Sequence, residues 1–135
     1  MAGKAKVFLV DNDYDFVEMN KAVLENAGYE VAYAYSMREA LEKIKSVLPQ
    51  LIVLDLMMEK HDSGFRFAKE IKTDPLFSHI PILMLTSVAE VTGFSFSQDL
   101  DGYWMKTDDF LEKPVSPEAL LAKVEELLAR AGSED

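Results

Sequence analysis

Short apolar runs alternate with helical patterns along the chain, and this alternation constrains the fold more than any other feature. Five segments read as strands because they are rich in apolar, β-branched or aromatic residues; they span 7–10, 29–35, 51–54, 81–85 and 110–111. Repeated alternation of strands and helices indicates an α/β fold around a parallel sheet. The runs 51–54 and 82–85 are apolar throughout, which is typical of parallel strands buried on both faces.

Local signals predict where the first helix ends and where the second begins and ends. Gly28 follows a segment with apolar residues at helical spacing, at the position where a glycine commonly ends a helix. Ser36 and Glu39 stand three residues apart and form a capping box, which predicts the start of the second helix. Pro49 is expected to end that helix because a proline has no N–H to donate.

Two further helices are expected in the second half of the chain. A polar loop that includes residues 63–64 leads to a helix with one apolar face. Ser116 as the N-cap and Pro117 as the first helical residue open the last helix. The final residues, 132–135, are expected to form a frayed tail or the start of a removed linker.

The segment between Thr86 and Phe110 departs from the alternation. Residues 91–97 combine Gly, Ser, β-branched and aromatic side chains, which are poor helix formers. We therefore expect an atypical extended region between the fourth and fifth strands, in which any helix is short, displaced or mobile. Its aromatic residues either contact a partner or cover the sheet where the helix is weak; they are Phe94, Phe96, Tyr103 and Trp104.

Length and charge limit the possible functions. The chain has 135 residues, which fits one domain over 1–135 with a core at about 5–131. Its 24 Asp and Glu against 14 Lys and Arg give a net charge of −10, which argues against binding nucleic acid or an anionic membrane by charge. There is no Cys, which excludes disulfides and thiolate metal sites. With no apolar signal core and no apolar run near membrane length, we expect a cytoplasmic protein.

Polar residues follow the strands at one edge of the expected sheet. Asp11, Asp55, Thr86 and Lys113 stand at the carboxyl ends of strands, where open parallel sheets bind ligands. If the first and third strands are neighbours, their backbones lie ~4.8 Å apart. Two carboxylates about 5 Å apart would then repel by roughly 3 kcal/mol at an effective dielectric of about 20. Mg²⁺ would remove this cost and prefers oxygen ligands. With the lysine and the hydroxyl, the set suits attack of a carboxylate on phosphorus.

Four motifs together make the sequence resemble the receiver domain of response regulators, the CheY-like module of two-component signalling. They are VFLVD at 7–11, LIVLDLMM at 51–58, ILMLTS at 82–87 and DDFLEKP at 108–114, and the resemblance covers about residues 5–130. It implies a flavodoxin-like, doubly wound five-stranded parallel sheet with strand order 2-1-3-4-5. It also implies a signalling switch rather than an enzyme, because such a domain catalyses only its own phosphorylation and dephosphorylation.

The resemblance assigns a role to each residue of the polar edge. Asp55 would accept a phosphoryl group from a partner histidine kinase or phosphotransfer protein. Asp11, Asp55 and the main-chain carbonyl of Met57 would hold Mg²⁺. Thr86 would bond a phosphoryl oxygen and move toward the phosphorylated site, and Lys113 would pair with Asp55 or its phosphate.

The same resemblance implies how the signal leaves the site. Phe110 occupies the position of the family's switch aromatic, which turns inward when Thr86 moves. The Lys113–Pro114 peptide bond is expected to be cis, as in the family. A downstream target or output domain would read the change through residues 88–112.

Several positions depart from the family pattern. Asn12 stands where the family usually has a second acid, so we expect weaker Mg²⁺ binding than in a receiver with the full acid pair. Asp13 is one residue too late to replace that acid by simple alternation, unless the loop bends it in. Glu59 stands where the family usually has Pro, and Ser87 replaces a small apolar residue.

Two other functions remain open from the sequence. A phosphatase of the haloacid-dehalogenase type would use Asp11 as the nucleophile, Asp13 as the acid/base and the acids at 108–109 for a metal. This chain, however, has Asp15 where that family has a hydroxyl residue. A degenerate receiver that binds partners constitutively is the other possibility, and Asn12 motivates it.

Overall fold

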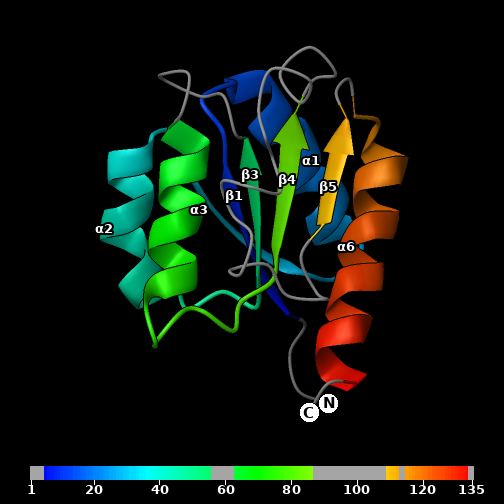
Figure 1. Cartoon of the computed structure of the whole chain (residues 1–135). Helices are drawn as coiled ribbons and strands as arrows, with labels where there is room; N and C mark the ends of the chain where they lie inside the picture. Colours follow the sequence, from blue (N-terminus) through cyan, green and yellow to red (C-terminus); the bar gives the residue numbers. More distant parts are fainter. Residues whose placement is uncertain (1–4, 56–62, 87–108, 113–114, 134–135) are drawn as a thin grey trace.

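A computed structural model of the chain describes residues 5–55, 63–86, 109–112 and 115–133. Strands and helices alternate through these residues (Figure 1). The elements are β1 Lys6–Val10, α1 Tyr14–Asn26, β2 Glu30–Ala34, α2 Met37–Val47, β3 Leu51–Asp55, α3 Ser63–Thr73, β4 Ile82–Thr86, β5 Asp109–Glu112 and α6 Pro117–Ser133.

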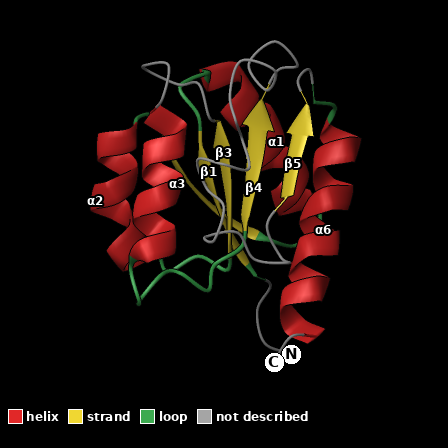
Figure 2. Cartoon of the chain, viewed as in Figure 1, coloured by secondary structure: helices red, strands yellow, loops and turns green. Residues whose placement is uncertain are grey.

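The strands form one parallel sheet in the order β2-β1-β3-β4-β5. The predicted α/β fold with a parallel sheet is confirmed, as is the order 2-1-3-4 of its first four strands. Helices α2 and α3 cover one face of the sheet, and α1 and α6 cover the other (Figure 2). The extended region expected between the fourth and fifth strands falls on 87–108, outside the described residues.

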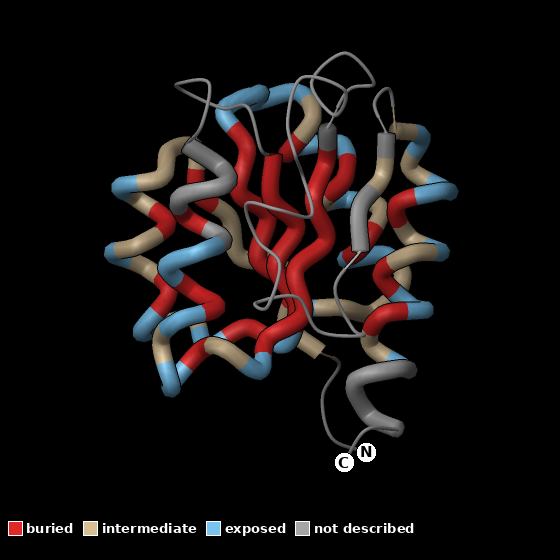
Figure 3. The backbone as a smooth tube through the Cα atoms, in the orientation of Figure 1, coloured by how far each residue is buried: buried red, intermediate tan, exposed pale blue. Residues whose placement is uncertain are grey.

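An apolar core lies on each face of the sheet, because successive strand residues point to opposite faces. One core packs against α2 and α3 and the other against α1 and α6, and the middle strand β3 is buried over its whole length (Figure 3). Strands β1 and β3 supply Phe8, Val10, Ile52 and Leu54 to the first core, and Val7, Leu9, Leu51 and Val53 to the second. The interpretation of 51–54 as a strand buried on both faces is therefore confirmed.

The predicted glycine stop of α1 is confirmed. Gly28 has φ 102°, a left-handed conformation that glycine adopts without a Cβ clash. Its N–H donates to the carbonyl of Glu25 (2.9 Å), and the N–H of Tyr29 donates to that of Leu24 (3.1 Å). These two bonds form a Schellman motif, which satisfies the last carbonyls of the helix.

Helix α2 ends in a different way, because no glycine is available. The residue after its last turn, Leu48, is left-handed (φ 49°, ψ 61°) and 64% exposed, and its N–H donates to the carbonyl of Ile44 (3.1 Å). Pro49 follows and cannot continue the helix, as predicted. A non-glycine residue in this conformation costs about 1 kcal/mol.

The two remaining helices differ at one end each from the sequence expectation. Helix α3 begins at Ser63, so residues 63–64 belong to the helix and not to the loop before it. Helix α6 continues to Ser133, through residues that were expected to be a frayed tail. Gly64 lies in the first turn of α3, and Gly132 lies in the last turn of α6. Neither glycine excludes its turn from the helix, because its cost of about 1 kcal/mol is too small. The N-cap of α6 is confirmed: the N–H of Ala119 donates to Ser116 Oγ (3.1 Å).

Candidate functional site

The sheet brings two carboxylates together at the carboxyl ends of its central strands. Val10, the last residue of β1, pairs with Leu54 of β3 in the parallel register. Asp11 directly follows β1, and Asp55 is the last residue of β3. Both acids are buried, with exposed fractions of 1% and 5%. Since neighbouring strands lie about 4.8 Å apart, two acidic groups share a small region with little access to water.

The loop that carries Asp11 is held in place by hydrogen bonds at both ends. The main-chain N–H of Asp11 donates to the carbonyl of Ala34 in β2 (3.1 Å). The N–H of Asp13 donates to Oδ1 of Asp11 (3.0 Å), and Oδ1 of Asp13 accepts from the N–H of Phe16 (3.1 Å). Asp13 is therefore the exposed N-cap of α1. Its side chain does not bend in to replace the acid missing at Asn12.

The third strand of the polar edge is β4. Asp55 pairs with Leu85, and Thr86 is the next residue and the last of the strand, so its backbone lies at the same edge of the sheet. Thr86 in turn pairs with Glu112, the last residue of β5. The structure thus brings together the strand ends that carry Asp11, Asp55 and Thr86.

Two residues of the predicted set cannot be placed. Met57 and Lys113 lie outside the described residues, as does Pro114, and their roles remain predictions. Phe110 is in β5 and pairs with Met84 of β4. Among the described residues, no group of three or more acidic or histidine side chains gathers into a metal cluster. The predicted ligand set contains two carboxylates, and its third ligand is a main-chain carbonyl.

The donor chemistry of this pair fits a hard divalent cation. Two ionised carboxylates on adjacent strands repel each other, and burial strengthens the repulsion because water screens it less. Carboxylate oxygens are the ligands that Mg²⁺ uses in proteins. A cation between Asp11 and Asp55 would convert the repulsion into attraction.

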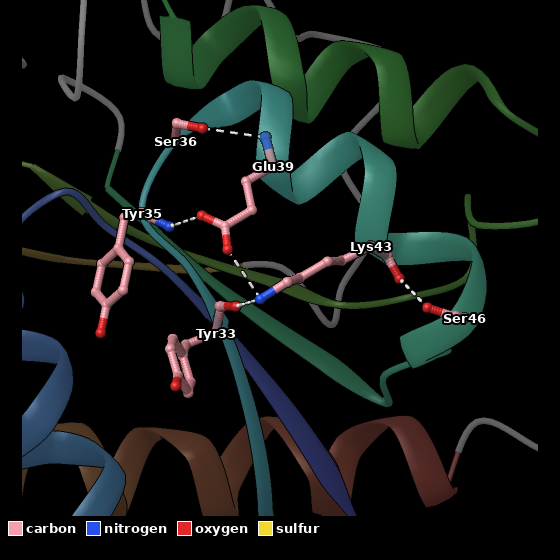
Figure 4. Close-up of polar contacts among 6 residues, drawn as sticks. All are labelled: Tyr33, Tyr35, Ser36, Glu39, Lys43 and Ser46. Carbon is pink, nitrogen blue, oxygen red and sulfur yellow. Dashed lines mark hydrogen bonds and ion pairs between the residues drawn. The ribbon is translucent and has the colours of Figure 1, made fainter.

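Sequence reasoning missed a cluster beside this site, where β2 meets α2. The Glu39 carboxylate accepts a hydrogen bond from the main-chain N–H of Tyr35 (2.9 Å) and pairs with Lys43 Nζ (2.9 Å). Lys43 also donates to the carbonyl of Tyr33 (2.8 Å) (Figure 4). The predicted N-cap at Ser36 is confirmed, since the N–H of Glu39 donates to Ser36 Oγ (3.0 Å). The Glu39 side chain accepts from Tyr35, one residue before the cap, which differs from the predicted capping box. The spacing of Glu39 and Lys43 by four residues was the available signal for the ion pair.

Hydrogen bonding and burial shift two pKa values in this cluster. The hydrogen bond from Tyr35 N–H, and then that from Lys43, hold the pKa of Glu39 below its ordinary value. Partial burial raises the pKa of the Tyr35 phenol, and the negative charge of Glu18 adds to the effect. At neutral pH Glu39 is therefore ionised and Tyr35 is neutral.

A cavity of about 460 Å³ lies at the opposite edge of the sheet. It is lined by residues at or before the amino ends of strands, among them Lys6, Gln50 and Ile80. It is therefore separate from the acids at the carboxyl ends. No described helix is both long enough and apolar enough to cross a membrane.

Comparisons with known proteins identify relatives that are about twice as long. The phosphate regulon transcriptional regulatory protein PhoB of Pseudomonas aeruginosa (strain PAO1) is 36% identical over 135 residues, which are 100% of this chain and 56% of that protein. The alkaline phosphatase synthesis transcriptional regulatory protein PhoP of Bacillus subtilis (strain 168) is 36% identical over 126 residues, 93% of this chain and 49% of that protein. The chain therefore spans about half the length of these curated relatives.

Solved structures of similar size share the fold. The chemotaxis response regulator CheY4 of Vibrio cholerae superimposes with a TM-score of 0.77 at 31% identity, covering 92% of this chain and 98% of that one. A two-component response regulator from Clostridium difficile gives 0.77 at 30% identity, covering 94% and 98%. The sequence profile of the response regulator receiver domain matches residues 7–125. The structure agrees with this match, because two buried acids lie at the carboxyl ends of adjacent strands. The chain therefore belongs to the response regulator receiver domain family.

Proposed function

We propose that Asp55 accepts a phosphoryl group from a partner histidine kinase or phosphotransfer protein. The phosphorylated domain then changes conformation and controls a downstream target or an output domain. The observation that carries this proposal is the placement of Asp11 and Asp55, buried on adjacent strands at the carboxyl edge of the sheet. Membership of the receiver family supports it.

Membership of the receiver family supports Asp55, rather than Asp11, as the nucleophile. Oδ1 of Asp11 accepts from the N–H of Asp13, which fixes the orientation of the Asp11 carboxylate. In the proposed step an oxygen of Asp55 forms a bond to phosphorus. The bond from phosphorus to the donor's imidazole nitrogen breaks, and its electron pair stays on the nitrogen.

The other residues of the edge assist this transfer. Asp11, Asp55 and the carbonyl of Met57 would hold Mg²⁺, which when bound supplies positive charge to offset that of the transferring group. Lys113 would add a second positive charge beside Asp55, and Thr86 a hydroxyl donor. Sequence similarity alone supports the parts given to Met57 and Lys113.

The proposal also covers where the chain acts, what it catalyses and which residues a partner contacts. The chain acts in the cytoplasm, and it has no catalytic activity beyond its own phosphorylation and dephosphorylation. Residues 88–112 form the surface that a partner reads. Hydrogen exchange with and without beryllofluoride, a phosphate mimic, tests this surface: protection of amides in 88–112 should change on activation, whereas protection in α6 should not.

Mass spectrometry after incubation with acetyl phosphate and Mg²⁺ tests the central proposal. One phosphoryl group should appear on Asp55, none should appear on Asp55→Asn, and the matched variant Asp13→Asn should label normally. Asparagine keeps the capping oxygen of Asp13, so this control retains the α1 N-cap. A label on Asp11, with turnover of a general phosphatase substrate, would support the haloacid-dehalogenase alternative. Failure of the wild-type chain to label would support the degenerate receiver.

A further inference from the structure

Two tyrosines connect the loop after β1 with the turn after β2, at the carboxyl edge of the sheet. Tyr14 is the first residue of α1, and Tyr35 follows the last residue of β2. Their rings contact each other, with centroids 4.2 Å apart and planes inclined by 46°. Tyr14 is nevertheless 64% exposed, so burial in the core does not explain its position.

Tyr35 is held from both sides. On the side of α2, its main-chain N–H donates to Glu39, whose carboxylate is paired with Lys43. On the other side, its ring lies 5.3 Å from the ring of Tyr33, and both tyrosine side chains project away from α2 (Figure 4). Tyr35 therefore presents a fixed ring against which Tyr14 packs.

Tyr14 is joined to the buried acid by an unbroken series of contacts. The residue before it, Asp13, donates its N–H to Oδ1 of Asp11 and caps the helix by accepting from Phe16. Because Tyr14 follows Asp13 directly, a ring contact that fixes Tyr14 also fixes the backbone that donates to Asp11. The contacts run from Glu39 through Tyr35, Tyr14 and Asp13 to the carboxylate of Asp11.

We propose that Tyr35 is a positioning residue for the metal-binding acid. By packing against Tyr14 it holds the loop of Asp11 in the orientation that binds a divalent cation, so that less conformational freedom is lost on binding. This inference rests on the proposed function, because it assumes that Asp11 and Asp55 bind the cation.

Calorimetric titration of the metal-free protein with Mg²⁺ alone tests the inference. Tyr35→Leu and Tyr14→Leu should each weaken Mg²⁺ binding by about two- to tenfold, the range of an aromatic pair contact. The double variant should bind Mg²⁺ as tightly as the single variant with the lower affinity, because each change removes the same contact. Tyr35→Phe keeps the ring and should bind as the wild type does.

Tyr29→Leu is the matched control, because Tyr29 lies just before β2, packs against the same core and is at the opposite end of that strand. Its Mg²⁺ affinity should equal that of the wild type. Equal affinity in Tyr14→Leu, Tyr35→Leu and the wild type, or equal weakening in Tyr29→Leu, would overturn the positioning role. If the wild type itself binds no Mg²⁺ and does not label on Asp55, the proposed function fails instead.

Discussion

The main-chain N–H of Asp13 donates to Oδ1 of Asp11 over 3.0 Å. This bond turns the loop after β1 back on itself, with Asn12 between the two acids. Only one of the three residues of the loop, Asp11, is buried. The loop thus places one anionic group beside Asp55, although its sequence contains two.

An acid at position 12 should strengthen cation binding. Asn12→Asp adds a negative charge close to the proposed Mg²⁺ position, and we expect about tenfold tighter binding from the added attraction. Calorimetry with Mg²⁺ measures the change. Asn26→Asp, which adds the same charge at the far end of α1, should leave the affinity unchanged; unaltered or weaker binding in Asn12→Asp would refute the prediction.

Repulsion between the two buried acids should limit the stability of the metal-free protein. In EDTA, Asp55→Asn should raise the free energy of unfolding by about 1–3 kcal/mol, because it removes one of two like charges. Mg²⁺ at about 100 times its dissociation constant should stabilise the wild type by about 2.7 kcal/mol and the variant by far less. Urea denaturation in both buffers measures this, with the exposed acid change Asp15→Asn as the control that should keep the full Mg²⁺ response.

The bond between Glu39 and Tyr35 should make stability depend on pH. The folded protein lowers the pKa of Glu39 below its ordinary value of 4.5, mainly through the bond from Tyr35 N–H. A lowered pKa means that the stabilisation is present above about pH 4.5 and is lost as the pH falls through the folded-state pKa. Glu39→Gln should therefore be less stable than the wild type by about 1 kcal/mol at pH 7, with the difference narrowing in acid.

The same helix offers a control for this experiment. Glu42 pairs with Arg38 over 3.6 Å at the same spacing of four residues, but both side chains are largely exposed. Exposed pairs of this kind contribute at most about 0.5 kcal/mol. Glu42→Gln should change stability little at any pH, and an equal loss in the two variants would count against a special role for the Glu39–Tyr35 bond.

The left-handed residue after α2 should be a site where the protein can be stabilised. Leu48→Asn places a residue that tolerates this conformation at an exposed position, so we expect a gain of about 0.5–1 kcal/mol. Leu48→Ala removes similar apolar surface but keeps the steric cost, and it should not gain. Thermal denaturation of the two variants separates the backbone effect from the loss of the side chain.

Sequence reasoning succeeded where the information was local. The strands were recognisable because each is a short apolar run, and the helix ends at Gly28, Ser36 and Ser116 were recognisable because their signals span a few residues. The placement of Asp11 near Asp55 followed from two premises. The carboxyl ends of neighbouring parallel strands meet at one edge, and the family resemblance implied that the first and third strands are neighbours.

The features that were missed depend on contacts between distant residues or on small energies. The contact of Tyr14 with Tyr35 joins a helix to the turn after β2, and no spacing in the sequence encodes it. Leu48 has no intrinsic preference for its left-handed conformation, which the end of α2 imposes. The ends of α3 and α6 were misjudged because a glycine changes helix stability by only about 1 kcal/mol.

Strand β2 is one of the two outer strands of the sheet, and two side chains of α2, Glu39 and Lys43, occupy part of its open side. The carbonyl of Ala34 accepts from the N–H of Asp11, on the side of β1. The main-chain carbonyl of Tyr33 and the main-chain N–H of Tyr35 therefore point outward, where they bind Lys43 and Glu39. An outer strand with free polar groups is a template on which a strand of another molecule can add. To add here, an incoming chain would first have to displace an ion pair. The Glu39–Lys43 ion pair therefore makes the addition of a foreign strand at this part of β2 less favourable.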